Sequence, residues 1–97
     1  MEIKITKTET PKVIPADSEL GFGKYFSDHM FVMDYEAGEG WKNARIVPFG
    51  YITLHPASTV LHYGSEIFEG LKAYRRADGG VQMFRPMENI RRMNRSA

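Results

Sequence analysis

The chain has 97 residues, of which 42% are hydrophobic and 26% charged, and its formal net charge is +1. A chain of this length forms at most one small domain with a modest core. The near balance of charges argues against a dedicated nucleic-acid-binding protein, which usually carries a basic excess. The sequence contains no cysteine, which excludes disulfides and thiolate chemistry.

The amino-terminal residues, MEIKITKTET, lack the apolar segment of a secretory signal peptide. No apolar run approaches the roughly 18 residues that a membrane-spanning helix requires. We therefore expect a soluble, cytoplasmic protein that has neither a membrane nor a nucleic acid as its partner.

The first half of the chain predicts strands. Residues 1–20 alternate weakly and contain two prolines, so we expect an extended arm with one edge strand. Residues 26–35, FSDHMFVMDY, alternate as a strand with apolar side chains on both sides, which predicts that both faces are covered. Glycines in residues 36–40 predict a turn into a returning strand. After a proline, this strand is expected to resume at residues 51–54.

A central helix is predicted after this hairpin. Ser58 or Thr59 has the residue type of an N-cap, and Gly70 is expected to end the helix with a positive φ. Gly64 leaves room on the apolar face for another group to approach. The apolar side chains of that face follow helical spacing: Val60, Tyr63, Ile67 and Leu71.

The last third predicts a second hairpin and a second helix. Residues 71–75 read as a strand, Asp78-Gly79 as a tight turn, and residues 81–85 as its partner strand. Pro86 suits the first position of a helix whose apolar face follows as Met87, Ile90, Met93 and Ala97. This helix carries no stop signal, so we expect a truncated chain. The predicted fold class is α+β, with antiparallel strands, hairpins and two helices.

Three arginines of the second helix, Arg91, Arg92 and Arg95, form a candidate anion site. Glu88 lies four residues before Arg92, a spacing that favours an ion pair. The pattern alone favours a solvated charged face. The alternative is a phosphate clamp, because a guanidinium group offers a rigid fork of donors to a dianion.

Tyr63 and Phe68 are the candidate ligand-contacting aromatics. Their spacing rotates them about 140° apart on a helix, so both cannot face one core, and we expect one to be available to a ligand or partner. Helical aromatics are otherwise most often core residues. The histidines lack metal-ligand spacing and have no cysteine beside them, so we predict no metal site: His29, His55 and His62.

Longer motifs carry a family resemblance. The run HPASTVLHYGSEIFEGLKAYR, with GFGKYFSDHM before it and FRPMENIRRMNRSA after it, resembles the branched-chain amino acid aminotransferases. These are pyridoxal-phosphate enzymes of fold type IV. The resemblance covers residues 21–97. LHYG followed by FEG is shared by several enzymes of that fold type, whereas SDHM together with ITLHPAS points to branched-chain substrates.

This resemblance implies that residues 1–97 are an incomplete N-terminal small domain, with residues 1–20 as its arm. It also implies a homodimer or higher homo-oligomer that transfers an amino group between leucine, isoleucine or valine and 2-oxoglutarate. The family's Schiff-base lysine belongs to a second domain that is absent here. The fragment is therefore expected to be inactive, with no catalytic residue, and Lys72 to be a strand residue near the site.

By the same resemblance, Arg92 matches the arginine that contacts the cofactor phosphate. Phe22, Tyr63 and Phe68 match residues lining the pocket for the substrate side chain, with Tyr63 reaching in from the neighbouring subunit. An apolar wall suits branched aliphatic side chains, since it leaves nothing to hydrogen-bond a polar group. Two alternatives remain: another fold type IV enzyme, such as a D-amino acid aminotransferase or aminodeoxychorismate lyase, and a non-catalytic interaction module.

Overall fold

The computed structural model describes all residues, 1–97, which divide into two compact units, Met1–Ile52 and Thr53–Ala97. Each unit has its own small sheet, and the second also carries two α-helices. Antiparallel strands and helices occur together, so the predicted α+β class is confirmed. Neither helix combines the length and the hydropathy needed to cross a membrane.

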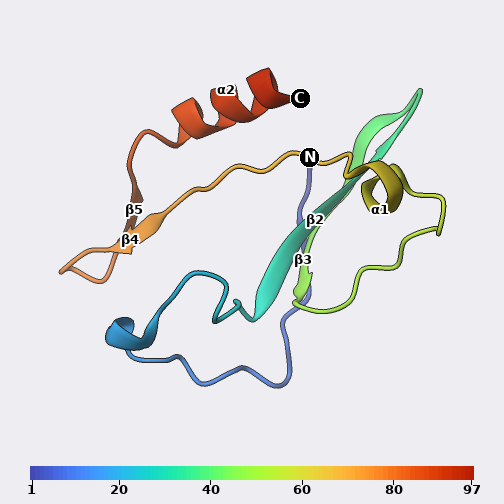
Figure 1. Cartoon of the computed structure of the whole chain (residues 1–97). Helices are drawn as coiled ribbons and strands as arrows, with labels where there is room; N and C mark the ends of the chain where they lie inside the picture. Colours follow the sequence, from blue (N-terminus) through green and yellow to red (C-terminus); the bar gives the residue numbers. More distant parts are fainter. The chain divides into compact units, whose positions relative to one another are not determined.

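The first unit is built on a three-stranded sheet (Figure 1). Its strands are β1 (Lys4–Ile5), β2 (His29–Glu36) and β3 (Gly40–Pro48), in the spatial order β1-β3-β2. β2 and β3 are antiparallel and joined by a tight turn, whereas β1 runs parallel to β3. The predicted hairpin and the predicted edge strand of the arm are therefore both confirmed.

Backbone register explains where β3 ends. His29, the first residue of β2, pairs with Pro48, and the Phe49 amide then donates to the Asp28 carbonyl at 2.8 Å. β2 has no further residues that could pair with residues 51–54. The predicted continuation of the strand there is wrong, because those residues have no neighbouring backbone to bond.

The prediction that both faces of β2 are covered is also wrong. Phe31 in the middle of β2 is 55% exposed, and Ala44 in β3, at 5% exposed, is the only buried residue of the chain. A sheet buries its apolar face against a second layer of structure. The first unit consists of a single sheet layer with an arm, so most of its apolar side chains are left accessible.

The arm is held beside β2 by polar contacts of its backbone. The Thr8 amide donates to His29 Nε2 at 2.9 Å, and the Lys12 amide donates to the Asp28 carboxylate at 2.9 Å. A single 3-10 turn, η1 (Asp17–Glu19), follows. The arm is thus extended, as predicted, apart from this turn.

The second unit begins with α1 (Thr59–Tyr63), which is much shorter than predicted. Ser58 is its N-cap, as expected, although its side chain makes no capping hydrogen bond. Gly64 adopts the left-handed conformation, with φ 59° and ψ 34°, and ends the helix there. Gly70 has no positive φ. The prediction of Gly70 as the helix end is wrong, because Gly64, which comes earlier in the chain, already adopts the left-handed conformation that ends the helix.

The second hairpin and α2 confirm their predictions (Figure 1). β4 (Ala73–Arg75) pairs antiparallel with β5 (Val81–Met83), and Gly79 in the turn between them has φ 84°. α2 (Pro86–Ser96) opens with its proline at the first helical turn. Proline suits this position because its missing amide would have no helical partner there.

Candidate functional site

The predicted site residues are divided between the two units. Phe22 lies in the first unit, in a turn beside Gly23, and its side chain is fully solvent-accessible at 102%. Tyr63, Phe68 and Arg92 lie in the second unit. Their roles in binding remain predictions.

Tyr63 and Phe68 are both exposed. Tyr63 is the last residue of α1 and is 84% exposed, whereas Phe68 follows in a non-helical segment and is 79% exposed. The helical angle between them therefore does not apply, because the helix ends at Gly64. Neither side chain packs in a core, so the usual interpretation of helical aromatics as core residues does not apply, and both side chains are accessible to solvent.

Arg92 is held by a glutamate next to Phe68. Arg92 Nε donates to Glu69 Oε2 at 2.7 Å, and Nη2 bonds the other carboxylate oxygen, so the pair is bidentate. The Glu69 side chain is only 8% exposed, whereas that of Arg92 is 62% exposed. A carboxylate screened from water thus holds a guanidinium group that is still largely solvated.

Asn89, one turn before Arg92 on α2, completes this cluster. Its side-chain amide donates to Glu69 Oε1 at 3.0 Å and to the Gly70 carbonyl at 2.7 Å. Asn89 and Arg92 lie three residues apart, so they project from the same face of the helix. The Phe68–Gly70 segment is therefore tied to α2 by side chains alone. We call Glu69, Asn89 and Arg92 the Glu69 cluster.

These contacts set the charge of the cluster. The hydrogen bonds from Arg92 lower the pKa of the Glu69 carboxyl from 4.5 to about 2, and Asn89 adds to this against the opposing effect of burial. The carboxylate in turn raises the pKa of the Arg92 guanidinium. Glu69 is accordingly ionised throughout the neutral range, and the ion pair stays intact there.

Arg91 has different partners, and the predicted pair between Glu88 and Arg92 is wrong. Glu88 pairs instead with Arg91 at 2.5 Å and with Arg85 at 3.7 Å. Glu69 attracts Arg92 away, since it offers both carboxylate oxygens from a partly buried position. Arg91 and Glu88 form an exposed charged pair on α2, whereas Arg92, which is equally exposed, pairs with Glu69 outside the helix.

Sequence reasoning missed Glu69, although a signal was available. It is a single carboxylate within the apolar run from Ile67 to Leu71. A charge placed among apolar residues and partly buried requires a partner. The arginines of the following helix offer that partner.

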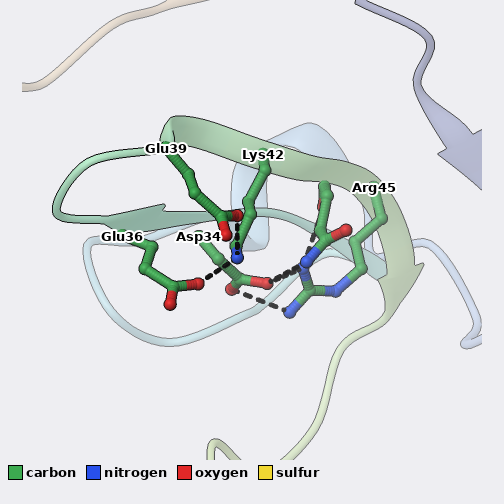
Figure 2. A network of polar contacts seen from close by, with 6 residues as sticks. Asp34, Glu36, Glu39, Lys42 and Arg45 are labelled. Carbon is green, nitrogen blue, oxygen red and sulfur yellow. Dashed lines mark hydrogen bonds and ion pairs between the residues drawn. The ribbon is translucent and has the colours of Figure 1, made fainter.

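A second polar network in the first unit was also missed (Figure 2). Arg45 on β3 binds both carboxylate oxygens of Asp34 on β2, at 2.9 and 3.2 Å, and Asn43 donates to the same carboxylate at 3.2 Å. These hydrogen bonds lower the pKa of the Asp34 carboxyl. Near the turn, Lys42 is paired with both Glu36 and Glu39.

This second network is structural by its position. It lies at the irregularity in the pairing of β2 with β3 between Val32 and Asp34, where Asn43 has a φ of 56°. The side-chain hydrogen bonds to Asp34 therefore lie where the ladder is locally disrupted. The groove beside it, about 810 Å³ in volume, is lined by six residues and by none of the predicted site residues: Glu2, Lys4, Asp34, Asn43, Ala44 and Arg45.

Each histidine has a hydrogen-bonding partner in the backbone. His29 accepts from Thr8, His55 Nδ1 accepts from the Ala57 amide at 3.0 Å, and His62 Nε2 lies 2.5 Å from the Pro56 carbonyl. No three histidine, aspartate or glutamate side chains are arranged to hold a metal ion.

Comparison with known proteins gives close matches to one kind of enzyme, although no family model matches the chain. The chain is 57% identical over 94 residues to branched-chain-amino-acid transaminase 1 of Bacillus subtilis (strain 168), which is 97% of this chain and 26% of that protein. A probable branched-chain-amino-acid aminotransferase of Staphylococcus aureus (strain N315) is 52% identical over 94 residues, again 97% of this chain and 26% of that protein.

The branched-chain-amino-acid aminotransferase of Mycolicibacterium smegmatis is 58% identical over 77 residues, 79% of this chain and 21% of that protein. The chain thus spans about a quarter of the length of the curated relatives it matches. The predicted resemblance to branched-chain aminotransferases is confirmed over nearly the whole chain.

Proposed function

We propose that this chain is the N-terminal part of an aminotransferase that transfers an amino group between leucine, isoleucine or valine and 2-oxoglutarate. The observation that carries this proposal is the 57% identity over 94 residues to a branched-chain-amino-acid transaminase. The 94 matched residues cover the positions of the LHYG and FEG motifs on which the resemblance was first based.

Pyridoxal phosphate is the proposed cofactor, with Arg92 as one contact of its phosphate. The donor set of Arg92 fits a phosphate, because its side chain is 62% exposed and Nη1 donates no hydrogen bond within the chain. When bound, the cofactor supplies a ring that accepts the electrons released from the substrate Cα. Arg92 would hold and orient the cofactor, and the base would come from a lysine in another part of the protein.

Phe22, Tyr63 and Phe68 are the proposed apolar wall for the substrate side chain. Their exposure leaves the ring faces free to contact a ligand or another part of the protein. Burial of apolar surface stabilises a complex by about 25 cal/mol per Å². Such a wall favours branched aliphatic side chains and offers no hydrogen bond to polar ones.

We propose further that the chain is a small domain of fold type IV within a cytoplasmic homo-oligomer. The support is the amount of uncovered apolar surface, since Ala44 is the only buried residue and large aromatic side chains are exposed in both units. Exposed apolar surface on this scale is typical of interaction sites. The remaining length of a protein like the relatives, together with a second subunit, would cover it.

The test is an amino-transfer assay on the full-length protein supplied with pyridoxal phosphate. We expect glutamate to form from 2-oxoglutarate with leucine, isoleucine or valine as donor, and the isolated 97-residue chain to form none. D-alanine as donor, and pyruvate release from aminodeoxychorismate, measure the two alternative activities. Turnover of either of these without any branched-chain activity would refute the proposal, as would a full-length protein that shows no turnover at all.

A further inference from the structure

We propose that Glu69 is a positioning residue that holds the Arg92 guanidinium group so that its free edge faces a phosphate. The proposal rests on the proposed function, which supplies the phosphate as that of pyridoxal phosphate. It assigns a role to a residue that the family motifs mark only as part of FEG.

The hydrogen-bond pattern of Arg92 divides its guanidinium group into two edges. Nε and Nη2 are used by Glu69, which occupies one edge of the plane. A guanidinium group carries five N–H donors in a fixed fork, so three remain: both of Nη1 and one of Nη2. One N–H of Nη1 and one of Nη2 point along the terminal edge, which has the spacing that a phosphate accepts in a bidentate contact, and the second N–H of Nη1 points back towards Cδ.

Glu69 is itself fixed. Its side chain is 8% exposed, and Asn89 donates to the same oxygen, Oε1, that bonds Arg92. Asn89 also holds the Gly70 carbonyl, which anchors the backbone on the C-terminal side of Glu69. A flexible and solvated arginine side chain is thereby attached to a fixed carboxylate, which reduces the side-chain freedom lost when an anion binds.

The opposite role for Glu69 would be competition with the ligand. A carboxylate beside a phosphate repels it, so electrostatics alone predicts tighter phosphate binding when Glu69 becomes neutral. A positioning role predicts weaker phosphate binding in that variant. A guanidinium group no longer held by Glu69 loses more conformational freedom when the phosphate binds it. The sign of the effect of Glu69→Gln therefore separates the two roles.

The experiment titrates pyridoxal phosphate and pyridoxal, which lacks the phosphate, into the apo form of the full-length protein. Glu69→Gln should weaken pyridoxal phosphate binding about 3-fold to 10-fold, the worth of one ordinary hydrogen bond, and leave pyridoxal binding unchanged. Glu66→Gln is the matched control. It removes the same charge from the same segment, at an exposed side chain that forms no hydrogen bond or ion pair.

A double-mutant cycle tests whether Glu69 acts through Arg92. In an Arg92→Ala background, Glu69→Gln should have no further effect on pyridoxal phosphate affinity. Tighter or unchanged binding by Glu69→Gln overturns the proposal, and so does an equal loss with and without Arg92.

A folding defect would lower the affinity for both probes together. In that case Glu69→Asp is the test of positioning, because it keeps the negative charge but shortens the side chain. Unchanged pyridoxal phosphate affinity in that variant overturns the proposal. A parent protein that binds no pyridoxal phosphate overturns the proposed function as well. Normal binding by the parent with no loss in the Glu69 variants overturns only the role of Glu69.

Discussion

The β2–β3 hairpin and the Glu69 cluster both contain a bidentate arginine–carboxylate pair, but the two pairs have different structural roles. Arg45 and Asp34 lie on strands already joined by backbone pairing along most of their length. Arg92 and Glu69 join a helix to a non-helical segment, and the hydrogen bonds between the two are donated by side chains of the helix. The first pair reinforces an arrangement that the backbone sets, whereas the second pair sets the arrangement.

A large expected effect on local stability follows from this difference. Glu69→Ala in the full-length protein should accelerate hydrogen exchange of the α2 amides about 10-fold, because the charge-assisted bonds to the neighbouring segment are lost. Asp34→Ala should change exchange in β2 and β3 less than about twofold, because backbone pairing joins these strands along most of their length. Hydrogen–deuterium exchange followed by mass spectrometry measures both. Equal effects on the two regions would contradict the distinction.

A smaller effect is expected at the end of α1. Gly64→Ala places a side chain at φ 59° and should destabilise the protein by about 1 kcal/mol. Gly70→Ala is the control, since Gly70 has no positive φ and a Cβ there would only touch the Phe68 ring at 3.8 Å. Its effect should stay within about 0.5 kcal/mol. Urea unfolding of the two variants gives the comparison, and a larger loss for Gly70→Ala would restore the longer helix predicted from the sequence.

These two glycines also show how far the sequence alone could predict the fold. Both hairpins and the start of α2 were predicted correctly, because a glycine-containing turn and an N-terminal proline act on their immediate neighbours. The apolar spacing of Val60, Tyr63 and Ile67 suggested a long helix, yet a local glycine outweighed the pattern. Apolar periodicity identifies the buried face of a helix only as far as the backbone stays helical.

The candidate site was less predictable, because its contacts join distant residues. Glu69 and Arg92 are 23 residues apart. The sequence offered a nearer partner for Arg92, Glu88, at a spacing that stabilises isolated helices. Only the position of the Phe68–Gly70 segment beside α2 decides between the two carboxylates. Arg92 was nominated by family resemblance, whereas Glu69 required the three-dimensional arrangement.

The most direct test of the proposed site compares Arg92→Ala with Arg91→Ala in the full-length protein. The two arginines are adjacent on α2, but Arg91 pairs with the exposed Glu88, whereas Arg92 is held by the partly buried Glu69. Titration of pyridoxal phosphate into the apo proteins should show a loss of roughly 10-fold to 100-fold for Arg92→Ala, the cost of one charge-assisted phosphate contact. Arg91→Ala should bind like the parent. Equal affinities for both variants and the parent would contradict the assignment of Arg92 to the cofactor phosphate.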